Sequence, residues 1–98
     1  MKDIGCYILW SDKIKKHYVG VCQDNLNNRI LAHNEHLYGK KSFSAITNDW
    51  SLFLFLKTDD FAHAVRIERK IKSMKSKVYI QNLSKYPELI QKIINETK

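Results

Sequence analysis

The chain has 98 residues, too few for two separate hydrophobic cores, so we expect one domain over residues 1–98. Its hydrophobic fraction of 44% suits a globular fold, and its longest apolar run, Leu52 to Leu56, is far too short to span a membrane. The formal net charge of +7 favours a polyanionic partner, because lysine and arginine release condensed counterions when they neutralise phosphates, although a need for solubility would also explain it.

The chain starts with the pattern of a β-hairpin. Residues 4–10 and 17–22 are rich in β-branched and aromatic side chains, and the mostly polar segment 11–16 between them is typical of a turn. Tyr7 lies in the first run and Tyr18 in the second. A tyrosine on a strand is most often a half-buried aromatic, so neither residue indicates a site by itself.

A helix is expected over residues 25–36, because the aspartate and asparagine at its start can cap unpaired backbone N–H groups. Leu26 and Ile30 form an apolar stripe on this helix, and Arg29 and His33 lie on or beside the same stripe. An arginine that faces a core needs an anionic partner. That partner is either a structural carboxylate at the edge of the core or an anionic ligand, and this helix alone leaves both open.

A loop and an apolar strand follow. Residues 34–49 contain scattered glycine, serine and asparagine, which are typical of a loop. Lys40 and Lys41 in this loop either contact phosphates or are simply solvated. Residues 50–57 form a continuous apolar run without polar alternation. We therefore expect both faces of this strand to be covered and the strand to lie at the centre of the sheet.

The helix expected over residues 59–74 again carries polar residues on its inward stripe. Glu68 lies near the centre of that stripe, and Lys72 follows one turn later. Alone, Glu68 is most often a salt-bridge partner and Lys72 a solvated lysine, although the long stem of Lys72 could also carry its ammonium to a phosphate. A short helix after Ser76 and a last helix over residues 87–96, with a proline in its first turn, complete the chain.

In this order and spacing, the polar residues resemble those of the GIY-YIG nuclease domain. The tripeptide Gly5-Cys6-Tyr7 stands where that family has Gly-Ile-Tyr, and Tyr18-Val19-Gly20 stands where it has Tyr-Ile-Gly. Arg29 and His33, four residues apart, match an arginine and a histidine on the family's first helix, and Glu68 matches its metal-binding glutamate. The ordered set carries the resemblance, because no single tripeptide is specific.

The chain departs from the family pattern at three places. Cys6 replaces the usual isoleucine, the segment from Gly20 to Arg29 is one residue longer than usual, and Val21 stands where some relatives have a lysine. The last departure argues against a lysine-assisted mechanism.

The resemblance implies an α+β fold, in which a three-stranded antiparallel sheet is flanked by helices. It covers about residues 4–82, to which the C-terminal helix 87–96 is added. It also implies a metal-dependent endonuclease that hydrolyses DNA phosphodiester bonds with Mg²⁺ or Mn²⁺. We expect DNA structure or a partner protein to direct the enzyme, in DNA repair or recombination, because no separate DNA-reading domain is evident.

The resemblance also assigns roles to residues. Arg29 would contact the scissile phosphate, Glu68 would hold the metal ion, and His33 would relay a proton or hydrogen-bond a tyrosine. Tyr18 would orient or deprotonate the attacking water and Tyr7 would contact the phosphate or the water network, but these two roles could be exchanged. The expected catalytic residues are Tyr7, Tyr18, Arg29, His33 and Glu68. The expected nucleic-acid contacts are Lys40, Lys41 and Lys72.

Other interpretations stay open. A non-catalytic basic DNA-binding module could share the fold, although the presence of both Arg29 and Glu68 argues against it. A nuclease that acts on RNA would have the same charge, and a simple salt bridge between Arg29 and Glu68 would explain both without chemistry. The catalytic interpretation predicts that the five residues converge on one shallow concave surface. It would be contradicted if Arg29 and Glu68 lay on opposite faces of the sheet.

The cysteines and the start of the chain indicate a cytoplasmic protein. Cys6 and Cys22 lack metal-ligand spacing and fall in or near expected strands, where a free cysteine behaves as a small buried hydrophobe. No signal sequence separates Met1 from the first strand, and a disulfide is not expected in a reducing compartment. We expect no membrane association and no small organic cofactor.

Overall fold

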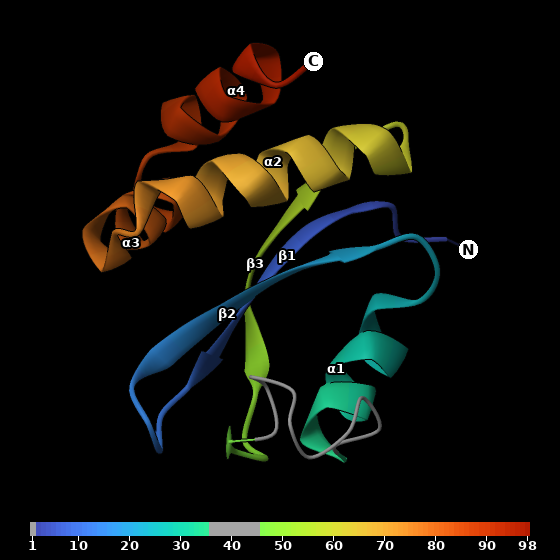
Figure 1. Ribbon diagram of the computed structural model, residues 1–98, viewed down its shortest axis with the longest axis vertical. Coiled ribbons are helices and arrows are strands. Elements are labelled where there is room, and N and C mark those ends of the chain that lie inside the picture. Colours follow the sequence, from blue (N-terminus) through green and yellow to red (C-terminus); the bar gives the residue numbers. More distant parts are fainter. Residues whose placement is uncertain (1, 36–45) are drawn as a thin grey trace.

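A sheet with helices on both faces forms the structure, which is a computed structural model that describes residues 2–35 and 46–98 (Figure 1). The antiparallel strands are β1 (Gly5–Ser11), β2 (Lys16–Cys22) and β3 (Ser51–Lys57). The helices are α1 (Leu26–Asn34), α2 (Phe61–Met74), α3 (Lys77–Lys85) and α4 (Pro87–Glu96). The predicted α+β class, with a three-stranded antiparallel sheet flanked by helices, is confirmed.

The strand order differs from the prediction. The order is β2-β1-β3, so the central strand is β1, and the prediction that residues 50–57 form the central strand is wrong. Coverage of β3 is also incomplete, since Leu52 is 47% exposed whereas Leu56 is 1% exposed. The apolar run has another cause: the register shifts between Ile8 and Leu9, which leaves Phe53 as an extra residue in β3. Such a bulge interrupts the alternation of faces.

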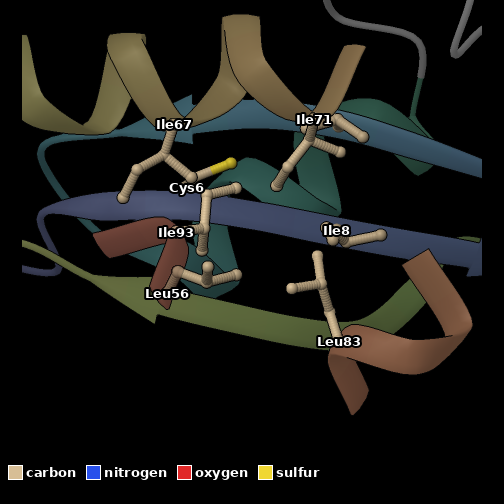
Figure 2. Packing of buried hydrophobic residues seen from close by; sticks show 8 residues of the cluster. Cys6, Ile8, Leu56, Ile67, Ile71, Leu83 and Ile93 are labelled. Atoms are coloured by element: carbon tan, nitrogen blue, oxygen red, sulfur yellow. The ribbon is translucent and has the colours of Figure 1, made fainter. Parts of the chain in front are cut away.

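The larger core lies between the sheet and α2, α3 and α4 (Figure 1). Figure 2 shows how side chains from α2, α3 and α4 meet those of the strands on this face. Each such buried aliphatic side chain contributes about 1.5–3 kcal/mol. Helix α2 begins after Asp60, whose carboxylate accepts a 2.7 Å hydrogen bond from the backbone N–H of His63. The fully described core members are Cys6, Ile8, Val19, Leu56, Ile67, Ile71, Leu83 and Ile93.

Helix α1 covers the opposite face of the sheet and packs against a second cluster formed by Tyr7, Leu9, Cys22, Leu26 and Trp50. Its N-cap is Asn25, whose side chain accepts a 3.0 Å hydrogen bond from Asn28 N. At its other end, Asn34 Nδ2 donates to Trp50 O over 2.9 Å, and Trp50 N donates to Asn34 Oδ1 over 2.6 Å. These paired bonds fix the end of α1 against the start of β3.

Two further sequence expectations concern the cysteines and the membrane. Cys6 and Cys22 are both buried and free, and they belong to the clusters on opposite faces of the sheet. Within residues 2–35 and 46–98, no helix has the length and apolar character needed to cross a membrane.

Candidate active site at the edge of the sheet

The expected catalytic residues come together around one cavity of about 270 Å³, here called the edge cavity. They reach it from four elements, β1, β2, α1 and α2. The described residues that line it are Tyr7, Tyr18, Gly20, Val21, Arg29, His33 and Glu68.

The convergence occurs at an edge and not on one face. Helices α1 and α2, which carry Arg29 and Glu68, cover opposite faces of the sheet, the arrangement that was expected to contradict a shared site. Both residues nevertheless line the edge cavity, because β2 is an edge strand and the cavity opens along it at Gly20 and Val21. The two charged residues therefore line one cavity along β2.

A buried hydrogen bond joins Tyr7 to His33. Both side chains are 3% exposed, and Tyr7 Oη lies 2.7 Å from His33 Nε2. Burial, and secondarily the positive charge of Arg29, lowers the pKa of His33 from 6.5 to about 4. The imidazole is therefore neutral at pH 7, with one donor and one acceptor nitrogen. A neutral imidazole can hold the tyrosine hydroxyl in place through this hydrogen bond.

Aromatic contacts place Tyr18 beside this pair. The ring of Tyr18 lies 4.7 Å from the ring of His33 and 6.4 Å from that of Tyr7, measured between centroids. Its ring also lies 6.0 Å from the ring of Trp50. These separations are typical of favourable aromatic pairs. Tyr18 is half-buried, so its ring is part of the packed wall while the residue still borders solvent.

Gly20 contributes space, which sequence reasoning missed. A Cβ atom at Gly20 would lie 2.6 Å from both Cζ and Oη of Tyr7. The two residues are partners across the β1–β2 ladder, and the Tyr7 ring extends over the glycine. Glycine at this position thus allows the Tyr7 hydroxyl to reach His33. The glycine of the tripeptide Tyr18-Val19-Gly20 could have indicated a close approach of another side chain, but the tripeptide was interpreted only as a family motif.

Arg29 already has a carboxylate partner on the chain. Its Nε donates to Asp24 Oδ1 over 3.1 Å and its Nη2 donates to Asp24 Oδ2 over 3.3 Å. Hydrogen bonding from Arg29 is the main cause that lowers the pKa of Asp24. The alternative in which Arg29 pairs with a structural carboxylate therefore matches its contact with Asp24. Sequence reasoning had considered Asp24 only as a helix cap, whereas Asn25 caps the helix and Asp24 orients the guanidinium.

A family model described as the GIY-YIG catalytic domain matches residues 3–83. The chain belongs to the GIY-YIG family. Searches of curated proteins and of solved structures each gave no match. The GIY-YIG domain is a nuclease-type fold, so the family supports a nuclease, and thus a hydrolase, in general terms.

Glu68 is the one carboxylate among the described residues that line the edge cavity. Its side chain is 20% exposed, and Glu68 Oε2 lies 3.6 Å from Lys72 Nζ one helical turn away. Among the residues that the structure describes, no group of three or more His, Cys, Asp or Glu could hold a metal ion. A single carboxylate still fits Mg²⁺ or Mn²⁺, because such ions often use one or two carboxylates together with waters and substrate phosphates. The donor set suits an ion shared with a substrate.

The expected nucleic-acid contacts have different outcomes. Lys72 lies beside the edge cavity with its side chain 54% exposed, so its ammonium is accessible to a phosphate. Lys40 and Lys41 lie outside the described residues.

Proposed function

We propose that this GIY-YIG domain is a metal-dependent endonuclease that hydrolyses DNA phosphodiester bonds. The observation that supports this most strongly is the edge cavity, where the Arg29 guanidinium, the Glu68 carboxylate and a hydrogen-bonded tyrosine–histidine pair meet. Phosphodiester hydrolysis needs charge stabilisation on the phosphate, an oriented water and a place for its proton. The cavity offers a group suited to each need.

Arg29 would bind the scissile phosphate through the same two nitrogens that it now donates to Asp24. Phosphate and carboxylate both accept such paired N–H bonds, so the contact with Asp24 orients the guanidinium in a geometry that a phosphate can use. Asp24 is exposed, so its carboxylate can be solvated when the phosphate replaces it.

Glu68 would hold the Mg²⁺ or Mn²⁺ ion, and Lys72 would move from the carboxylate to a phosphate. A bound divalent ion supplies positive charge at the phosphate and lowers the pKa of water. The 3.6 Å contact between Glu68 and Lys72 supports this role, because the carboxylate already attracts a cation beside the cavity.

Tyr18 would orient the attacking water or accept its proton, and Tyr7 would hold the phosphate or the water network. A free tyrosine has a pKa near 10, so a base role requires a nearby positive charge, which Arg29 on the same cavity provides. His33 would take part through its hydrogen bond with Tyr7, in which the neutral imidazole orients the tyrosine hydroxyl. The two tyrosine roles could also be exchanged.

Substrate choice would depend on DNA structure or on a partner protein, and DNA repair or recombination is the setting that we propose. The polar side chains of the edge cavity are suited to a phosphate and a water, and phosphate contacts carry no sequence information. One domain over residues 1–98 and a cytoplasmic location stay predictions.

A non-catalytic DNA-binding module is the second candidate, and one observation favours it. Arg29 and Glu68 each have a partner of opposite charge on the chain, Asp24 and Lys72 respectively. A domain that only binds DNA could keep both pairs permanently. A cleavage assay separates the two candidates.

The decisive experiment incubates the protein with branched, duplex and single-stranded DNA, and with RNA of the same sequences, in Mg²⁺, Mn²⁺ or excess EDTA. We expect cleavage of DNA only with a divalent ion and none by Glu68→Ala. The matched control is Glu96→Ala on α4, which also removes a glutamate paired with a lysine one turn away. Cleavage that persists in EDTA would contradict the metal role. Cleavage of RNA but not of DNA would show that RNA, and not DNA, is the substrate.

A further inference from the structure

A second cavity of about 270 Å³ lies between the end of the β1–β2 hairpin and the junction of α2 with α3. We call it the lysine pocket. Its apolar floor is formed by Val19, Ile71 and Ile80, and the remaining lining residues that the structure describes are polar or basic. They are Lys15, Lys16, His17, Lys72, Lys75, Ser76 and Lys77.

The lysine pocket gathers more positive charge than nearby acids offset, because Lys72 pairs with Glu68 and Lys15 with Asp12 while three further lysines line it. Five of its described lining residues are lysines, and none of these lining residues is acidic. The favourable field at the C-terminal end of α2 explains the positions of Lys72 and Lys75. It does not explain Lys15 and Lys16, which come from the hairpin. Lysines that converge from separate elements repel one another, so the arrangement suits an anion that bridges them.

Two of these lysines occupy backbone conformations that favour glycine. Lys15 has φ of 54° and Lys75 has φ of 47°. Lys75 lies directly after α2, at the position where glycine most commonly ends a helix. Lysine gains nothing from this backbone conformation, and strained residues of this kind cluster at functional sites. The two positions come from different parts of the chain, the hairpin turn and the end of α2, and both line the same cavity.

A contact between the two sides holds the pocket together. Lys77 Nζ donates to the backbone oxygen of Lys15 over 3.2 Å and lies 5.2 Å from the centre of the Trp10 ring. This contact fixes the start of α3 against the hairpin. The two lysine-bearing walls are therefore linked through the chain itself.

The lysine pocket continues from the edge cavity. Glu68 lines the edge cavity and Lys72 lines the lysine pocket, and these side chains are 3.6 Å apart. Both cavities border β2, one at Gly20 and the other at Lys16. Four residues of an extended strand span about 13 Å, which is the axial length of about four base-pair steps of duplex DNA.

We propose that the lysine pocket binds the sugar-phosphate backbone of the nucleic-acid substrate beside the bond that is cut. This inference rests on the proposed nuclease function and extends it from Lys72 to the other residues of the lysine pocket, which that function did not include. The lysines would contact successive phosphates, and the apolar floor would lie against the sugars between them. A strand whose scissile phosphate meets Arg29 would pass Lys72 and continue toward the hairpin turn.

The test removes two lysines without straining the fold. In the pocket variant Lys15→Gly/Lys75→Gly, glycine suits the left-handed backbone at both positions, so the melting temperature should not fall. The control variant Lys85→Gln/Lys92→Gln removes the same charge from α3 and α4, away from both cavities. Affinity for duplex DNA is measured in EDTA by fluorescence anisotropy over a series of salt concentrations, with inorganic phosphate as a competitor in a separate series.

We expect the pocket variant to reduce the slope of log K against log salt by about 1.8, from about 0.9 per lost phosphate contact, and to weaken binding by about tenfold or more. The control variant should change the slope by much less. Equal slopes for the two variants would overturn the proposal. The proposal would also be overturned if the pocket variant made inorganic phosphate a weaker competitor but left DNA affinity unchanged. The pocket would then bind a free anion only.

The same series separates this inference from the nuclease proposal. DNA binding that depends on the pocket, in a wild-type protein that never cuts with metal present, would contradict the nuclease function and support the pocket. Normal cutting with equal slopes for the pocket and control variants would support the nuclease function and overturn the pocket.

Discussion

Gly20 acts on the site through the side chain that it lacks. The hydroxyl of Tyr7 occupies the space that a Cβ atom would need, and that hydroxyl is the atom that reaches His33. The position of one tyrosine therefore depends on a residue that makes no polar contact through a side chain. Such dependence is local, and it can be tested by adding one methyl group.

Gly20→Ala should displace the Tyr7 ring and break its 2.7 Å bond to His33. Because the clash is with a buried ring, we expect a loss of about 1–3 kcal/mol in the free energy of unfolding. At a temperature where the Gly20→Ala variant is still folded, its cleavage rate should nevertheless fall, so lost stability alone cannot explain the lost activity. Urea unfolding and cleavage assays measure the two effects. Ser51→Ala, at an exposed position on β3, serves as the control. A Gly20→Ala variant with unchanged stability and cleavage would contradict this account.

His33 is predicted to titrate near pH 4 in the folded protein, well below its usual 6.5. Since the unfolded chain binds the proton more readily, the stability that neutral His33 contributes is fully present above pH 6.5 and is lost as the pH falls toward 4. NMR titration of the imidazole measures the pKa directly. Arg29→Ala should raise this pKa, because it removes a repelling charge, whereas Lys92→Ala on α4 should not. A pKa near 6.5 in the wild type would contradict the burial argument.

At the scale of elements, local patterns predicted most of the structure and long-range pairing did not follow from them. The hairpin, the helix that carries Glu68 and the last helix lie close to their expected positions, because period, caps and turn residues are local signals. The strand order could not be predicted, since an apolar run reports burial and not the number of neighbouring strands. In β3 the run reflects contacts with two clusters and a bulge.

The clamp between α1 and β3 should be sensitive to one amide. Asn34→Ala removes both hydrogen bonds to the Trp50 backbone and leaves a buried N–H and a C=O to find new partners. We expect a loss of about 1–3 kcal/mol in the free energy of unfolding. Because His33 precedes Asn34 on the same helix, the pKa of His33 should also shift upward as the helix end loosens. Chemical denaturation and NMR titration give the two readouts.

The control for this clamp is Asn28→Ala, which makes the same substitution at an exposed position of α1. Its backbone N–H, which bonds to the cap, is retained. The free energy of unfolding should change by no more than about 0.5 kcal/mol. Equal stabilities of the two variants would show that the Asn34 contacts do not fix the helix.

At the scale of the whole molecule, the edge of the sheet decides the architecture of the site. The sequence predicted that Arg29 and Glu68 point inward from their helices, because stripe analysis treats each helix separately. It could not predict that the helices lie on opposite faces or that the free edge of β2 brings the two charges to one cavity. Asp24, Gly20 and the lysine pocket were missed for the same reason, since each depends on contacts between elements.

The last prediction compares the removal of each charge from the edge cavity. Glu68→Ala should abolish cleavage but change stability by less than about 0.5 kcal/mol, because its partner is an exposed lysine one turn away. It should leave DNA binding unchanged or tighter, since a negative charge near the phosphate is lost. Arg29→Ala should also abolish cleavage, and it should weaken binding by about 1–3 kcal/mol through loss of a phosphate contact.

The controls for this comparison are Glu96→Ala and Arg69→Ala, which remove the same charges at exposed positions outside the edge cavity. Thermal melts, anisotropy and cleavage assays on the four variants distinguish chemistry from structure. A purely structural role predicts little change in melting temperature for either cavity variant, because the partners Asp24 and Lys72 are exposed, and it predicts no divergence in DNA affinity. A lower DNA affinity of Arg29→Ala beside an unchanged or higher affinity of Glu68→Ala, with both proteins folded and inactive, is expected when a phosphate binds near both side chains.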